Sequence, residues 1–137
     1  MQNSADSATA AIATAITPLL SVRRGTEAVA FYTAAFGAQE HNRWTDDSGD
    51  IVAHLSIGTA AFLVADEAPA HRQFSPEALG GTTVRIELTV ADPDTVFQQA
   101  VAAGGHEVFA VDDQSWGLRQ GRLEDPYGHH WLVGRPL

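Results

Sequence analysis

A chain of 137 residues with 45% apolar content has the usual size and composition of one soluble domain. The net charge of −9, with eight arginines and no lysine, leaves no basic stripe, so we exclude nucleic-acid binding. The absence of cysteine excludes disulfides, thiolate metal sites and a cysteine nucleophile, and it fits a cytoplasmic location.

The first residues, MQNSADSATAAIATA, combine small side chains with neither a basic segment nor a long apolar run. They are typical of neither a signal peptide nor a membrane span. No other segment reaches the roughly 18 consecutive apolar residues of a transmembrane helix, so we expect no membrane partner. We interpret residues 1–14 as a disordered tail that precedes a single domain over residues 15–137.

The domain contains an internal repeat, which is a strong indication of its architecture. Val22 matches Val90 and Gly37 matches Gly105, so the offset is 68 residues in both pairs. Each copy starts with an apolar run, over Ile16–Val22 in the first and Val84–Val90 in the second. We therefore divide the domain into a first unit, a linker and a second unit, over residues 15–66, 67–82 and 83–137.

An amphipathic helix pattern follows the apolar run in both copies. In the first copy the apolar stripe includes Tyr32, which we place in the core, and Gly37 is suited to end the helix in a left-handed conformation. In the second copy Asp92 is the expected N-cap, Pro93 occupies the first helical position, and Gly104–Gly105 end the helix.

Three strand-like runs, separated by turn residues, follow each helix pattern. We therefore predict an α+β fold in which two βαβββ repeats form an incomplete barrel around a concave cleft. The linker is long for a compact domain, as expected of a lid or binding loop. The predicted strands are Glu40–Thr45, Ile51–Ile57, Ala60–Ala65, Glu107–Val111, Leu118–Glu124 and His130–Val133.

Several motifs in this order resemble the vicinal oxygen chelate superfamily, which includes glyoxalase I, bleomycin-resistance proteins and extradiol dioxygenases. The resemblance is closest to the PhnB-like branch and covers about 120 residues. It implies a cleft for a small molecule and a homodimer. The motifs are SVRRGTEAVAFYTAAFGAQE, HLSIGTAAFLVADE, SPEALGG, AVAAGG and DDQSWGLRQGRLEDPYGHHWLV.

In metal-dependent members, the resemblance implies one ligand from the first and one from the last strand of each unit. Those positions are approximately Thr17, Leu63, Arg85 and Leu132, and none offers a good metal ligand. A divalent ion about 5 Å from a guanidinium would also be repelled by roughly 6–7 kcal/mol at an effective dielectric of about 20. We predict that the usual metal is absent and that no other cofactor is bound.

Alternation along the strand that follows the linker places Arg85 and Glu87 on the concave side. Val84, Ile86 and Leu88 should face the helix. Because an unpaired buried charge costs several kcal/mol, the two charged residues either pair structurally, for example with each other, or hold a polar ligand.

His54 lies in the middle of a predicted strand and is either a structural histidine or a functional one. A functional imidazole here would be a hydrogen-bond donor, a base or an off-pattern metal ligand. Alternation places His130 on the inward face with Leu132, and His129 on the helix side with Trp131.

Aromatic and basic residues give further candidates for a ligand-binding wall. Gly117 separates Trp116 from Leu118–Arg119, which permits a backbone turn beside a pocket. Trp44 and Phe109 either add apolar wall or belong to the core. The stretch Asp125–Gly128 has the residues of a turn, and we assign it no chemistry.

Two functions are consistent with these residues. The first is sequestration of, or resistance to, a small organic molecule bound without the usual metal. The second is a metal-independent or atypical-metal lyase or isomerase that uses His54 and Glu87 as acid–base groups together with Arg85. The sequence lacks a phosphate loop, a nucleophile elbow and an HExxH motif.

Overall fold

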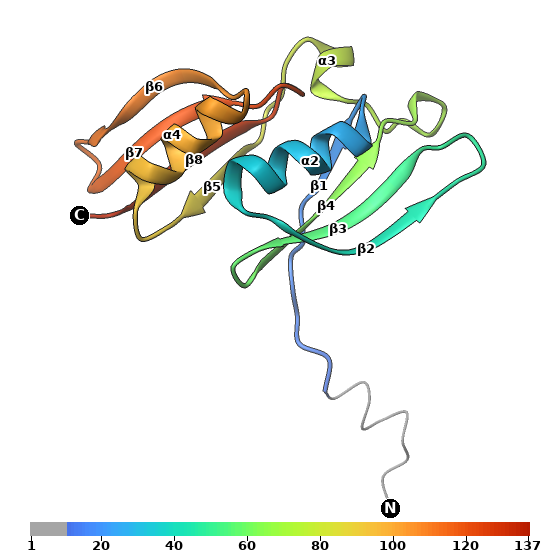
Figure 1. Cartoon of the computed structure of the whole chain (residues 1–137), viewed down its shortest axis with the longest axis horizontal. Coiled ribbons are helices and arrows are strands. Elements are labelled where there is room, and N and C mark those ends of the chain that lie inside the picture. Colours follow the sequence, from blue (N-terminus) through green and yellow to red (C-terminus); the bar gives the residue numbers. More distant parts are fainter. Residues whose placement is uncertain (1–10) are drawn as a thin grey trace, which may run out of the picture.

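The computed structural model of the protein describes residues 11–137, so most of the predicted disordered tail, residues 1–10, lies outside the described part. Two units with the same βαβββ order follow one another along the chain (Figure 1). The first unit contains β1 (Leu19–Val22), α2 (Gly25–Phe36), β2 (Gln39–Thr45), β3 (Ile51–Ile57) and β4 (Ala60–Asp66). The second contains β5 (Arg85–Thr89), α4 (Pro93–Ala103), β6 (His106–Asp113), β7 (Leu118–Glu124) and β8 (His130–Pro136). The predicted α+β fold with two repeats is confirmed.

Each unit forms its own four-stranded sheet, and the two sheets have equivalent topology. The strand orders are β1-β4-β3-β2 and β5-β8-β7-β6. In each sheet the first strand runs parallel to the last, while the other pairs are antiparallel. The register places Leu19 opposite Leu63 and Glu87 opposite Leu132. The sheets remain open and do not close into a complete barrel.

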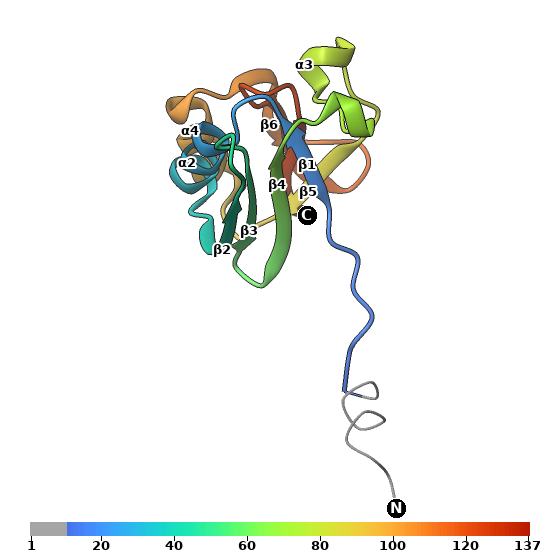
Figure 2. The same ribbon diagram turned by 90° about the vertical axis from the view of Figure 1, so that its right-hand side faces the viewer.

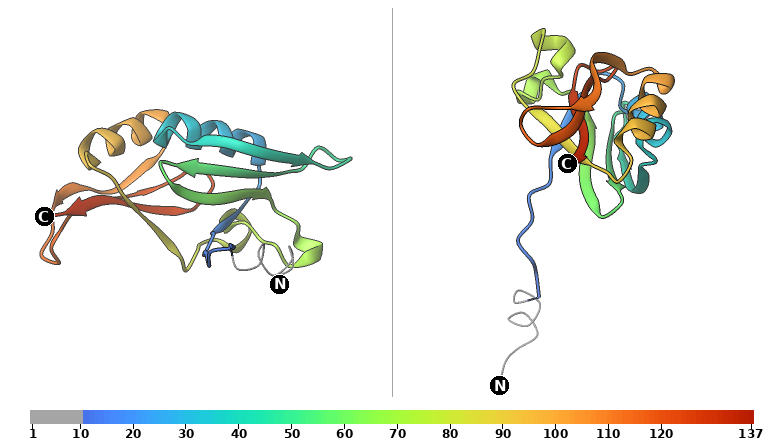
Figure 3. Two further views of the ribbon diagram at one scale, coloured as in Figure 1. Left: turned by 90° about the horizontal axis from the view of Figure 1, so that it is seen from below. Right: turned by 90° about the vertical axis from the view of Figure 1, so that its left-hand side faces the viewer.

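Helices α2 and α4 contact each other and lie along one side of the two sheets (Figure 3). On β3 the residues that face the helices are apolar and buried and alternate with less buried ones, whereas the edge strand β2 is exposed throughout. The other side of each sheet, which we call the open face, is covered by neither α2 nor α4. The buried core on the helix side includes Val22, Tyr32, Phe36, Leu55, Phe62, Val64, Leu123, Trp131 and Val133.

The helix ends match the sequence prediction. Gly37 adopts a left-handed φ of 68° after α2, a conformation in which a Cβ would be strained. The side chain of Asp92 accepts a hydrogen bond from the backbone N–H of Thr95 at the start of α4, with Pro93 at the first position. Gly104 caps the other end of this helix.

A buried carboxyl group joins the two units. The Tyr32 hydroxyl on α2 donates to Asp125 Oδ2 at 2.5 Å, and Trp131 Nε1 donates to the same oxygen at 2.9 Å. The backbone N–H groups of Tyr127 and His129 donate to Oδ1. Asp125 is only 3% exposed, so the predicted turn also connects the second unit to the helix of the first.

Three details of the prediction were wrong. β1 begins only at Leu19: the carbonyl oxygen of Pro18 still accepts a hydrogen bond from the N–H of Leu63, but residues 11–14 lead away from the folded body (Figure 2). Val84 does not face the helix: β5 starts one residue later, and Val84 is 64% exposed. His129, expected on the helix side with Trp131, instead lines the space between β1 and β5, and its Nε2 is 2.9 Å from the carbonyl oxygen of Ser21.

The segment between the units, residues 67–82, is not a plain linker. It contains a 3₁₀ turn η1 (Pro69–His71) and a short helix α3 (Pro76–Leu79). Ser75 is the N-cap of α3, because its hydroxyl accepts from the N–H of Ala78. None of the helices within residues 11–137 is long and apolar enough to cross a membrane.

Candidate ligand-binding site

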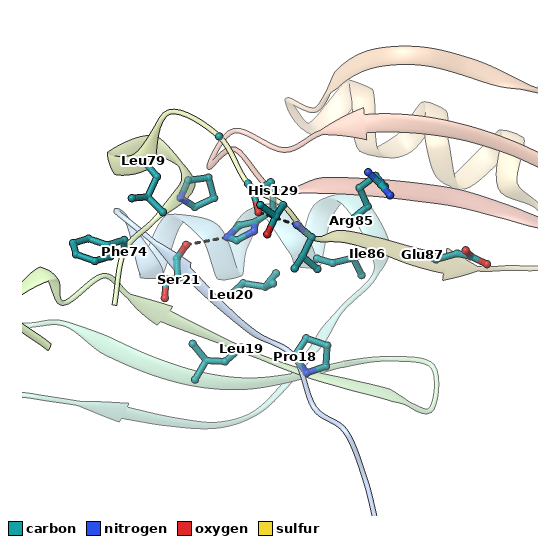
Figure 4. A pocket seen from close by; sticks show the side chains of 15 residues that line it. Pro18, Leu19, Leu20, Ser21, Phe74, Leu79, Arg85, Ile86, Glu87 and His129 are labelled. Atoms are coloured by element: carbon teal, nitrogen blue, oxygen red, sulfur yellow. Dashed lines mark hydrogen bonds between the residues drawn. The ribbon is translucent and has the colours of Figure 1, made fainter. Parts of the chain in front are cut away.

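A cavity of about 750 Å³ opens between β1 and β5, beneath the connecting segment (Figure 4). This volume lies within the roughly 300–1,000 Å³ of small-molecule pockets. The apolar lining comes from all three segments and consists of Pro18, Leu19, Leu20, Phe74, Pro76, Leu79, Val84 and Ile86. The polar side chains are fewer and are those of Ser21, Thr82, Thr83, Arg85, Glu87 and His129.

Contacts to both units hold the connecting segment over the cavity. Within the segment, the Ser75 hydroxyl donates to Glu67 Oε1 at 2.6 Å, and this hydrogen bond lowers the pKa of Glu67. The segment is joined to the first unit by a second contact. Arg24 Nη1 donates to Glu77 at 3.3 Å. On the second unit, Gly128 packs so closely that an added Cβ would lie 2.7 Å from Pro76 Cβ. The roof of the cavity is therefore anchored on two sides.

Arg85 and Glu87 lie on β5, at the side of the cavity away from Phe74 (Figure 4). Both side chains are exposed. Within residues 11–137, neither forms an ion pair or a side-chain hydrogen bond, with each other or with another residue. The structural pairing that the sequence allowed is therefore not seen, and the two charges are available to a ligand.

The other predicted residues do not share this cavity. Trp44, His54 and Leu63 lie on the open face of the first sheet. The register requires this, because His54 pairs with Leu63 and Trp44 pairs with Val52, two residues before His54. Thr17 lines an adjoining hollow of about 430 Å³ that also includes Glu87. His54 does not line the cavity, so the acid–base set proposed for a lyase or isomerase is not assembled there.

The remaining predicted residues belong to the second unit, and two of them lie on the open face of its sheet. His130 and Leu132 lie on β8, and Arg122 Nε donates to His130 Nδ1 at 3.1 Å. Phe109 and Trp116 line a hollow of about 390 Å³ near the turn between β6 and β7. His130 and Leu132 therefore lie directly beside Arg85 and Glu87 on the neighbouring strand without lining the cavity, whereas Phe109 and Trp116 line a different hollow.

The guanidinium of Arg119 has a structural role, because it pairs with two carboxylates of the same unit. Its Nε and Nη2 donate to the two carboxylate oxygens of Asp94 on α4, at 2.8 and 2.7 Å, and its Nη1 donates to Asp113 at 3.0 Å. The paired guanidinium lowers the pKa of Asp94, and the two carboxylates raise the pKa of Arg119. Arg119 therefore holds the β6–β7 hairpin against the helix.

Sequence reasoning missed His41 and the roof of the cavity. Alternation counted back from Trp44 would place His41 on the helix side, but a bulge between Glu40 and Asn42 breaks the alternation. His41 Nε2 consequently lies 2.6 Å from Ser56 Oγ, and its ring centroid is 6.0 Å from that of His54. The Ser-Pro-Glu sequence before Ala78 is a helix-start signal that could have indicated α3.

The positions implied for a metal do not fit one. Thr17, Leu63, Arg85 and Leu132 supply one hydroxyl, two alkyl groups and a cation. The strand partners of Leu63 and Leu132 are Leu19 and Glu87. Taking these two partners as the first-strand positions, in place of Thr17 and Arg85, adds only one carboxylate. Across residues 11–137, no group of three or more His, Cys, Asp or Glu side chains could hold a metal ion. We therefore derive no chemistry from a metal.

Two βαβββ units with equivalent open sheets, helices on one side and a cavity at their junction define a glyoxalase-type fold. The sequence profile of the Glyoxalase/Bleomycin resistance protein/Dioxygenase superfamily matches residues 13–133. The chain belongs to this superfamily, which confirms the resemblance to the vicinal oxygen chelate proteins.

Individual relatives support the same assignment. An uncharacterized protein of Mycobacterium tuberculosis H37Rv is 40% identical over 127 residues, which cover 90% of this chain and 75% of that protein. The crystal structure of TioX from Micromonospora sp. ML1 has 28% identity and a TM-score of 0.71, covering 91% of this chain and 100% of that one. FosX, a fosfomycin resistance protein from Listeria monocytogenes, shares the fold at 15% identity, with a TM-score of 0.69 and coverages of 92% and 94%.

Proposed function

We propose that the protein binds a small organic molecule in the cavity between β1 and β5, in the manner of a sequestering or resistance protein and without the usual metal centre. The observation that carries this proposal is the cavity itself, which has a ligand-sized volume of about 750 Å³ and a mainly apolar lining. The unsuitable side chains at the four metal positions support the metal-independent form. Within the superfamily, we place the chain in the PhnB-like branch and in the cytoplasm.

We also propose that two copies associate through their open faces. Trp44 is more than half exposed on the open face of the first sheet, with Val52 beside it. On the second unit Val108 is exposed on β6, and Trp116 is exposed in the adjacent β6–β7 turn. Apolar side chains gathered on uncovered sheet faces are typical of interfaces, and symmetric dimers are the commonest closed assemblies.

The binding proposal is tested with the purified full chain after treatment with a chelator. A panel of aromatic, cationic and phosphonate compounds, including bleomycin and fosfomycin, is titrated by calorimetry. We expect at least one compound to bind without added metal. Leu19→Arg should lower its affinity at least tenfold, which corresponds to about 1.4 kcal/mol, because the new side chain fills the cavity with a charge.

Val101→Arg is the matched control. Val101 is a partly exposed residue of α4 that does not line the cavity, so the same substitution there should leave the affinity unchanged. The proposal fails if no compound binds, or if binding appears only after a divalent metal is restored.

A further inference from the structure

We propose that the ligand is dipolar: an apolar body that carries an anionic group for Arg85 and a cationic group for Glu87. This inference rests on the proposed function, because it names the chemical class of the molecule bound in the cavity. It begins from the two charged side chains on β5, which have no ion-pair or hydrogen-bond partner in the described part of the chain, residues 11–137.

The placement of the two charges sets the first constraint. Arg85 and Glu87 are two residues apart on one strand, so both project from the same face, with Cα atoms about 6.6–6.8 Å apart. Both line the cavity, and within residues 11–137 neither forms an ion pair. Four other arginines are paired with carboxylates, and of these Arg24 and Arg119 each contact two.

Desolvation sets the second constraint. A molecule that fills the cavity displaces water from both charged groups, and a charge that loses water without gaining a partner is unfavourable. A purely anionic ligand would satisfy Arg85 but leave its own charge near Glu87, and a purely cationic ligand would do the reverse. A dipolar ligand pairs with both groups, so the cavity selects for it and against singly charged analogues.

The apolar lining of the cavity indicates the chemical nature of the uncharged part of the ligand. Phe74 and Leu79 are exposed on the roof, and Leu19 is exposed on β1 across from them. Covering these side chains favours an aromatic or branched aliphatic body. The expected ligand therefore places its apolar part beneath the connecting segment and its two charges toward β5.

The test uses four probes that share one aromatic ring: 4-(aminomethyl)benzoate, 4-methylbenzoate, 4-methylbenzylamine and 4-methylbenzyl alcohol. Each is titrated into the full chain and into Arg85→Gln, Glu87→Gln and Arg135→Gln. Arg135 provides the control, because it is exposed and lies outside the cavity.

We expect the dipolar probe to bind at least tenfold more tightly than each singly charged probe. Arg85→Gln should remove the advantage given by the carboxylate, Glu87→Gln should remove the advantage given by the amine, and Arg135→Gln should change neither.

If the alcohol binds the native chain as tightly as the dipolar probe, or if neither cavity variant alters the ranking, the inference is wrong while the binding function stands. The inference is also wrong if these probes fail but another class of compound from the panel binds. If neither the probes nor any panel compound binds, the proposed function fails as well.

Discussion

At the scale of single residues, Asp125 is the side chain on which the junction of the two units depends. Its carboxyl group is buried and accepts four hydrogen bonds, two of them from the side chains of Tyr32 and Trp131. A buried polar group is tolerated when its partners are in place, and removal of one partner is costly. Asp125 thus links α2 to the turn before β8, and through this turn to the edge of the cavity.

Tyr32 makes this link sensitive to alkaline pH. Burial raises the pKa of the Tyr32 hydroxyl well above 10, and the neighbouring Asp125 raises it further. The native state therefore holds the proton more tightly than the unfolded state, so the stabilisation is complete below about pH 10 and lost as the pH rises. Burial also raises the pKa of Tyr127. Each group lowers the free energy of unfolding by at most about 1.4 kcal/mol per pH unit.

Tyr32→Phe should reduce the free energy of unfolding by about 1–2 kcal/mol at neutral pH, because Asp125 loses one donor. It should also make the decline above pH 10 shallower. Urea titrations between pH 7 and 11 measure both effects, with Tyr127→Phe as the comparison that retains the Tyr32 contribution. An unchanged decline in Tyr32→Phe would contradict this role.

The sequence identified some site residues and not others for a clear physical reason. Arg85 and Glu87 were found because alternation along one strand places them together without knowledge of the tertiary fold. Phe74 and Leu79 were missed because they reach the cavity only through the path of the connecting segment. The role of Asp125 was missed because its partner Tyr32 is 93 residues away.

At the scale of elements, local signals predicted the fold closely. Ile51–Ile57 and Leu118–Glu124 are strands with the predicted bounds. The caps at Gly37 and Asp92 also agree, since capping depends on a few neighbouring residues. Errors arose where longer-range pairing decides the outcome: β1 begins only at Leu19, whose strand partner is Leu63. The bulge that redirects His41 is likewise a property of the strand pair.

The connecting segment shows how elements create the cavity. It is fixed to the first unit by the ion pair between Glu77 and Arg24, and to the second unit by the close packing of Pro76 on Gly128. Since these contacts reach both units, the segment holds a roof over the gap between β1 and β5. The length of the segment is typical of a lid or binding loop, and it allows the segment to span the two units.

At the scale of the whole molecule, the open faces of the two sheets predict association. Sedimentation equilibrium of the full chain should give the mass of a dimer. Trp44→Glu should shift the mass toward that of one chain, because a charge placed on the open face opposes burial. Val101→Glu, on the helix side, provides the control and should remain dimeric. A single-chain mass for the native protein at all concentrations would contradict the dimer.

We propose above all that an organic molecule, and not a metal ion, occupies the cavity between β1 and β5. A crystal structure of the full chain with a compound selected by calorimetry tests it most directly. We predict that the compound lies between β1 and β5, beneath Phe74 and Leu79. A divalent ion coordinated at the positions of Thr17, Leu63, Arg85 and Leu132 would contradict the account.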